Sequence, residues 1–191
     1  LGAKHPTIPR AGLSPIQRGN LVHWSLENFW NQAHRSSSLK DMCQVQVWIA
    51  NSIEAALERF ENYYPGMMKK TFRRLEARRL NILLLDWLDL EKSRIPFIVK
   101  ASEEKSELLL GGLRFSVRID RVDRLEHSNH LILLDYKSKT GNSSTSWFRQ
   151  RITEPQLPLY AVNLWEGTLA AIAFAQVHNR AIWKLISVTI D

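Results

Sequence analysis

The sequence contains a single cysteine, Cys43, among its 191 residues. One cysteine excludes an internal disulfide framework and any zinc or iron–sulfur site that needs four cysteine ligands. No apolar run reaches the roughly 20 residues that span a bilayer, and the chain does not open with a signal-peptide pattern. These absences favour a reducing, cytoplasmic setting without membrane contact.

Basic residues outnumber acidic ones, 26 Lys and Arg against 19 Asp and Glu, which gives a formal net charge of +7. This balance favours an anionic partner, most commonly nucleic acid, although a basic solvated surface explains the composition equally well. The length and the 45% hydrophobic content fit a single domain, residues 1–191, with a full core. Because the first residue is Leu1 rather than Met, we expect the chain to be a fragment of a larger protein.

Helical periodicity predicts three helices, at about 14–33, 39–62 and 67–90, which form a helical portion at 14–90 after an irregular leader at 1–13. The first begins with Ser14-Pro15-Ile16-Gln17, which fits a capping box with proline at the first helical position. Four-residue spacing places Gly19 and His23 on one face of this helix. The glycine would let another element approach closely. A lone helix histidine is more typical of a structural role than of a ligand.

The first half of the third predicted helix is basic and has Glu76 as its only acid. Its cations are Lys69, Lys70, Arg73, Arg74, Arg78 and Arg79. This pattern indicates either a phosphate-contacting face or a solvated helix surface. Like charges four residues apart repel by a few tenths of a kcal/mol per pair, so their retention hints at a compensating anion.

Residues 96–191 predict a sheet core. Strands are expected at about 96–101, 108–110, 113–125, 131–137, 169–178 and 182–190, with a helix at about 155–165. Between the strands at 113–125 and 131–137, the polar residues Glu126–Asn129 predict a hairpin turn, which makes these two strands antiparallel.

Asp120 and Asp135 lie on the two strands of this hairpin, and Lys137 lies two residues after Asp135. Because side chains on a strand repeat every two residues, Asp135 and Lys137 share a face. Two neighbouring carboxylates repel one another unless a cation lies between them, and oxygen ligands with open positions suit Mg²⁺ or Mn²⁺. The alternative is a simple salt bridge between Asp135 and Lys137, since Asp-x-Lys is a common tripeptide.

Four motifs lie within this hairpin or on either side of it in the sequence. They are Arg18-Gly19-Asn20-Leu21-Val22-His23, Arg118-Ile119-Asp120-Arg121-Val122-Asp123, Asp135-Tyr136-Lys137-Ser138 and Gln156-Leu157-Pro158-Leu159-Tyr160. Their order and spacing, over about residues 14–165, resembles the RecB-like branch of the PD-(D/E)XK nuclease superfamily, including the nuclease domains of AddB-type proteins. The resemblance implies an α/β fold with a restriction-endonuclease-like core, in which helices flank a central mixed β-sheet.

The resemblance also implies roles for individual residues. Asp120, Asp135 and the backbone oxygen of Tyr136 would bind the metal, which His23 would either bind or help to orient. Lys137 would be the catalytic lysine. The residues that would support the site or contact DNA are Gln156, Tyr160, Arg118 and Glu103, the last because the family often carries an acid before the glycine turn. From the charge pattern, the candidates for contact with the DNA backbone are Lys69, Lys70, Arg73, Arg74 and Lys139.

The function that the resemblance implies is a Mg²⁺- or Mn²⁺-dependent DNA nuclease, expected to be an exonuclease in repair or recombination. The iron–sulfur cluster of some relatives is excluded because it needs four cysteines. Without a Gly-x-x-x-x-Gly-Lys-Ser/Thr loop, any ATP-driven unwinding would need a helicase domain or subunit as a partner. Two alternatives stay open: a non-catalytic DNA-binding module of the same fold, and an RNA-binding or scaffold protein. Inactive relatives usually lose at least one motif residue, and none is missing here.

Overall fold

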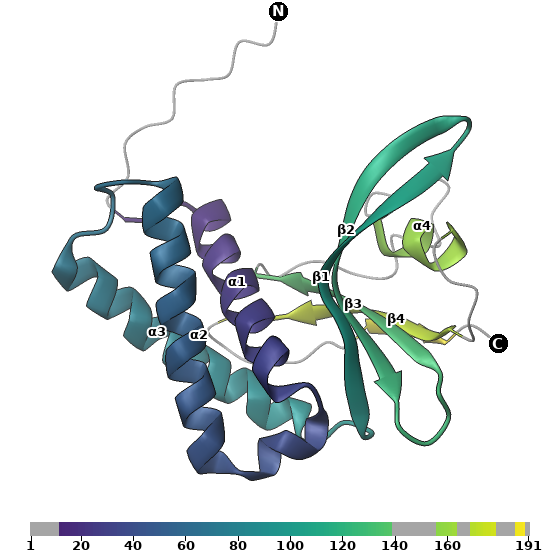
Figure 1. Ribbon diagram of the computed structural model, residues 1–191, viewed down its shortest axis with the longest axis horizontal. Helices are drawn as coiled ribbons and strands as arrows, with labels where there is room; N and C mark the ends of the chain where they lie inside the picture. The colour runs from purple at the N-terminus through teal and green to yellow at the C-terminus, as the bar shows by residue number, and fades with distance from the viewer. Residues whose placement is uncertain (1–11, 139–155, 164–168, 179–185, 190–191) are drawn as a thin grey trace, which may run out of the picture.

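The computed structural model describes residues 12–138, 156–163, 169–178 and 186–189. Three long helices, α1 (Pro15–Ala33), α2 (Met42–Tyr63) and α3 (Lys70–Glu91), lie on one side of a sheet, and the short helix α4 (Gln156–Asn163) lies on the other (Figure 1). This arrangement confirms the predicted α/β class and the N-terminal helical portion. Within the described ranges, none of the helices has the length and hydropathy that crossing a membrane requires.

The sheet is mixed and has five strands in the order β1-β2-β3-β4-β5. These are β1 (Phe97–Leu110), β2 (Leu113–Leu125), β3 (Leu131–Lys137), β4 (Leu169–Gln176) and β5 (Ile186–Thr189). Strands β3 and β4 are parallel, whereas the other neighbouring pairs are antiparallel. The predicted hairpin of β2 and β3 is therefore confirmed, and β3 occupies the centre of the sheet.

The helix starts follow local capping chemistry. The predicted capping box of α1 is present, because Ser14 Oγ accepts from the Gln17 N–H at 3.2 Å and Gln17 Oε1 accepts from the Ser14 N–H at 2.8 Å. Helix α2 begins later than expected, after a 3₁₀ turn at Ser36–Lys40. There Asp41 is the N-cap and accepts from the Gln44 N–H at 3.1 Å.

Alternation along β3 divides the core between the two faces of the sheet. Leu134 and Tyr136 are buried against the three long helices, in a cluster that includes Trp30. Leu133 is buried on the opposite face, in a second cluster that includes Leu157 of α4. By the same alternation Asp135 and Lys137 belong to the α4 face, while the side chain of Tyr136 belongs to the helical face.

Strands β1 and β2 form a two-stranded ribbon that extends beyond the rest of the sheet (Figure 1). The sequence predicted two separate strands, at 96–101 and 108–110, and this prediction is wrong because β1 is continuous from Phe97 to Leu110. The polar stretch between them pairs with β2 throughout, with one bulge between Val99 and Ala101. By contrast, β2 pairs with β3 only over Arg121–Arg124, so none of the described strands pairs with β2 along the distal ribbon except β1.

The strand registers place three acidic positions in one row across the sheet. The pairs Ser102↔Arg121 and Glu104↔Ile119 put the backbone of Glu103 opposite that of Asp120. Continuing the pair Arg121↔Leu134 by one residue puts Asp120 opposite Asp135. Asp120 therefore lies within β2 rather than at its end, at the point where β3 leaves its partner.

Candidate metal and catalytic site

The peptide groups at Tyr136 form the centre of the candidate site. The Tyr136 N–H donates to Asp120 Oδ2 at 2.6 Å. Its carbonyl oxygen lies 3.0 Å from His23 Nε2, and the other ring nitrogen of His23, Nδ1, lies 3.4 Å from Asp120 Oδ1. The structure thus brings together three of the residues singled out in the sequence, from α1, β2 and β3.

Both ring nitrogens of His23 face oxygen atoms of the site. A doubly protonated imidazole donates through both nitrogens, whereas a metal ligand needs one nitrogen with an available lone pair. The arrangement therefore suits a histidine that orients the Tyr136 carbonyl and the Asp120 carboxylate. This is the second of the two roles that the resemblance implied for His23.

Asp135 and Lys137 form an ion pair on the α4 face, with 2.6 Å between Lys137 Nζ and Asp135 Oδ2. The ammonium group also lies 5.4 Å from the centre of the Phe174 ring, within range of a cation–π interaction. Burial, and then the neighbouring carboxylate of Asp120, raise the pKa of Asp135 from its ordinary value to about 6, although Lys137 opposes them. An ionised Asp135 beside the carboxylate of Asp120 is therefore energetically costly unless a further cation lies nearby.

The donor chemistry of this site fits a hard divalent cation with an incomplete protein shell. Asp120, Asp135 and the Tyr136 carbonyl offer oxygen atoms, and Mg²⁺ usually binds one or two carboxylates while keeping waters and substrate phosphates. In the part of the chain that the structure describes, no group of three or more His, Cys, Asp or Glu side chains is placed to hold a metal ion. The side chain of Glu103 lies outside the described residues, so its predicted supporting role stays a prediction.

Helix α4 brings the fourth motif to the same face. The Tyr160 hydroxyl donates to the Arg118 carbonyl oxygen at 3.3 Å. Burial raises the pKa of Tyr160, a hydrogen bond with Gln156 opposes this, and the charge of Asp135 contributes a further rise. Gln156 and Tyr160 therefore lie near the acidic pair, as expected of residues that support the site.

Gly19 in α1 allows the end of β3 to approach the helix. A Cβ atom at this position would lie 3.1 Å from Ser138 Oγ, which is tighter than an ordinary contact. Ser138 directly follows Lys137, and His23 lies one helical turn beyond Gly19. The predicted close approach of another element to Gly19 is thus confirmed, and the element is the end of the strand that carries Asp135 and Lys137.

Part of the basic charge of α3 is compensated within the protein. Arg73 forms ion pairs with Glu54 and Glu61 of α2, and Arg79 pairs with Glu76 at 2.6 Å. The compensating anions that the sequence pattern called for are therefore partly carboxylates of the chain itself. The other predicted DNA contacts on α3, Lys69, Lys70 and Arg74, are exposed, and Lys139 lies outside the described residues.

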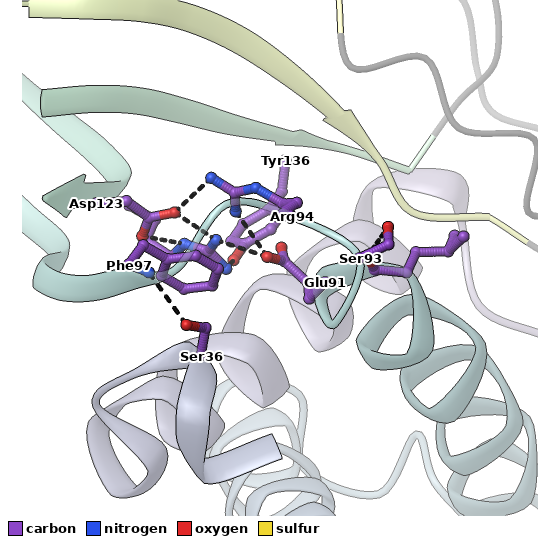
Figure 2. Close-up of polar contacts among 9 residues, drawn as sticks. Ser36, Glu91, Ser93, Arg94, Phe97, Asp123 and Tyr136 are labelled. Atoms are coloured by element: carbon purple, nitrogen blue, oxygen red, sulfur yellow. Dashed lines mark hydrogen bonds and ion pairs between the residues drawn. The ribbon is translucent and has the colours of Figure 1, made fainter. Parts of the chain in front are cut away.

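A second polar cluster, which the sequence did not predict, lies on the helical face of the sheet (Figure 2). It consists of Glu91, Arg94, Arg121, Asp123 and the hydroxyl of Tyr136. The one signal in the sequence is that Arg121 and Asp123 continue the two-residue alternation of the apolar residues Leu113, Phe115, Val117 and Ile119, and so fall at positions expected to face the core. Charged residues at such positions are almost never fully buried unless paired.

The fold and the site together indicate a class of protein. A mixed sheet flanked by helices, with two acids and a lysine on its central strands, defines an α/β domain of the restriction-endonuclease-like class. The sequence model described as the PD-(D/E)XK nuclease superfamily matches residues 1–186, and the chain belongs to this superfamily, whose members are in general metal-dependent nucleases. A search among curated proteins finds no significant match.

The contact at Gly19 can be tested by a double-mutant cycle. Gly19→Ala should gain less than the ~1 kcal/mol that alanine usually gains over glycine within a helix, because its Cβ meets Ser138 Oγ. In a Ser138→Ala background the gain should be restored, which gives a coupling of roughly 0.5–1 kcal/mol in urea unfolding. Additive effects of the two substitutions would show that the contact is not tight.

The raised pKa of Asp135 predicts a pH dependence of stability in EDTA. Because the folded protein binds this proton more tightly than the unfolded chain, the unfolding free energy should fall as pH rises from about 4 to above 6. Relative to Asp135→Asn, the loss should be on the order of 2–3 kcal/mol. Exposed Asp86 in α3 offers the control Asp86→Asn. If the unfolding free energy of Asp135→Asn varied with pH as that of the wild type does, the raised pKa of Asp135 would be contradicted.

Proposed function

We propose that this protein is a metal-dependent deoxyribonuclease that acts as a RecB-like exonuclease in DNA repair or recombination. The observation that supports nuclease activity best is the meeting of Asp120, Asp135, Lys137 and the Tyr136 carbonyl where β3 separates from β2. The RecB-like branch, the exonuclease mode and the repair setting are supported by the resemblance of the four sequence motifs.

Each residue would contribute a distinct step to phosphodiester hydrolysis. Asp120, Asp135 and the Tyr136 carbonyl would hold Mg²⁺ or Mn²⁺, which when bound acidifies water and stabilises charge on the phosphate. His23 would keep the Tyr136 carbonyl and Asp120 in place through its two ring nitrogens. Lys137, which pairs with Asp135, would orient the attacking water and stabilise the developing negative charge.

The β1–β2 ribbon is the element that we expect to guide DNA to this site. Arg114, Ser116 and Arg118 alternate on one exposed face of β2, and the next residue on that alternation is Asp120. The residues between them, Val117 and Ile119, pack into the cluster around α4, as does Val122 two residues beyond Asp120. The exposed residues Arg114, Ser116 and Arg118 therefore lead along β2 towards the acidic pair, which suits contact with DNA phosphates.

The non-catalytic DNA-binding module remains the second candidate because one observation favours it. Within the described ranges, no third acidic or histidine side chain joins Asp120 and Asp135 as a potential metal ligand. Such a module would bind DNA through the same basic surfaces and leave it intact under every metal condition.

The decisive experiment measures cleavage of linear single- and double-stranded DNA with Mg²⁺, with Mn²⁺ and with EDTA. Wild-type protein should cleave only with a metal, while Asp135→Asn and Lys137→Ala should lose at least ~100-fold in rate and still bind DNA. Asp86→Asn is the matched control and should cleave normally. Wild-type protein that binds DNA equally with and without metals and never cleaves it would establish the second candidate.

The role of the ribbon can be tested separately by DNA binding in EDTA. Arg114→Ala should weaken binding of every sequence alike and reduce the slope of log affinity against log salt by about 1, because one phosphate contact is lost. Arg35→Ala, at an exposed arginine that pairs with Ile98 near the opposite end of β1, is the control. Equal salt slopes for wild type and Arg114→Ala would exclude the ribbon from the DNA path.

A further inference from the structure

The cluster on the helical face of the sheet is a closed set of buried charges (Figure 2). Arg121 binds Asp123 through two hydrogen bonds, of 2.8 and 2.7 Å, and reaches Glu91 at 3.0 Å. Arg94 completes the set by pairing with Glu91 at 2.6 Å and with Asp123 at 2.9 Å. Two positive and two negative charges balance, and the side chains of Glu91, Arg121 and Asp123 have no solvent exposure.

Packing around Arg121 leaves its guanidinium group little freedom to move. Its central carbon lies 4.4 Å from the centre of a Trp30 ring and 5.1 Å from that of Phe97. These two ring contacts, together with the paired hydrogen bonds to Asp123, restrict both the position and the plane of the guanidinium group. The remaining member of the cluster, a fifth partner beside these four charged residues, is therefore held at a defined point in the core.

That fifth partner is the hydroxyl of Tyr136, which accepts from Arg121 Nη1 at 2.9 Å. The same residue donates its N–H to Asp120, and its carbonyl oxygen lies 3.0 Å from His23 Nε2. Its ring is 3% exposed and meets the edges of His23 and Trp87, with ring centres 5.8 and 6.0 Å apart. Tyr136 thus connects the buried charges to the candidate metal site through a single side chain.

We propose that Arg121 is a positioning residue for the metal site, acting through the hydroxyl of Tyr136. By holding the far end of the ring, Arg121 sets the orientation of the Tyr136 peptide, and with it the distance of the carbonyl from His23 and of the N–H from Asp120. This inference rests on the proposed function, since it assigns to Arg121 a part in arranging the ligands. Groups that orient metal ligands without touching the metal commonly change its affinity by 10–100-fold.

Substitution of Arg121 itself is a poor test. Removing one partner of a buried ion pair leaves an uncompensated charge in the core, so Arg121→Ala would be expected to unfold the protein. Tyr136→Phe is the sharper variant because it keeps all four charges and the ring, and removes only the hydroxyl that joins the cluster to the site. Tyr64→Phe is the matched control, since Tyr64 is a half-buried tyrosine at the end of α2 that packs on Phe60 with ring centres 4.8 Å apart.

The test measures Mn²⁺ binding to the protein alone by titration calorimetry, at a temperature well below the melting transition of every variant. Tyr136→Phe should bind Mn²⁺ about 10-fold more weakly than wild type, and Tyr64→Phe should bind it equally well. In cleavage assays the kcat of Tyr136→Phe should recover at high Mn²⁺, with an unchanged KM for DNA. A merely structural hydroxyl would lower the melting temperature and leave the metal dependence unaltered.

The outcomes separate this inference from the proposed function. If wild type binds Mn²⁺ and cleaves DNA while Tyr136→Phe matches it in Mn²⁺ affinity and metal dependence, the positioning role of Arg121 is overturned and the nuclease assignment stands. If wild type neither binds Mn²⁺ nor cleaves DNA, the proposed function fails and the inference fails with it.

Discussion

The hydrogen bonds made by Tyr136 are the constraint on which both faces of this protein depend. Its N–H donates to Asp120 and its carbonyl oxygen contacts His23, while its hydroxyl accepts from Arg121 in the core. A β-strand makes this possible, because alternate side chains point to opposite faces while the peptide groups lie between them. The strand that carries Asp135 and Lys137 is therefore aligned by contacts made one residue away, on the face that the two do not share.

Two groups of charges lie on either side of this strand, and they differ in how completely they are satisfied. In the cluster around Arg121 each carboxylate pairs with two guanidinium groups, and burial costs are offset by geometry. On the other face, burial of Asp135 and the nearby carboxylate of Asp120 outweigh its pairing with Lys137, so its pKa rises to about 6. A balanced group stabilises a fold, whereas an unbalanced one favours binding of a cation.

The sequence was sufficient for features that depend on local chemistry. The capping box at Ser14 and the β2–β3 hairpin follow from short-range patterns, and the alternation of β3 predicts which residues share a face. The continuous β1 could not be predicted, because its polar middle acquires strand structure only by pairing with β2. Nor could the partners of Arg73 be inferred from one helix, since Glu54 and Glu61 come from another. Arg121 was missed because charge usually indicates exposure.

The cluster around Arg121 has a consequence for how the chain folds. Glu91 closes the last turn of α3 and Arg94 follows it, whereas Arg121 and Asp123 belong to β2. Glu91 and Arg94 pair with each other, as do Arg121 and Asp123, but each carboxylate gains its second guanidinium partner only when α3 packs against β2. Docking of the two portions therefore completes the pairing of both carboxylates. Separating the portions would break both cross-pairs, which couples the unfolding of the helical portion to that of the sheet.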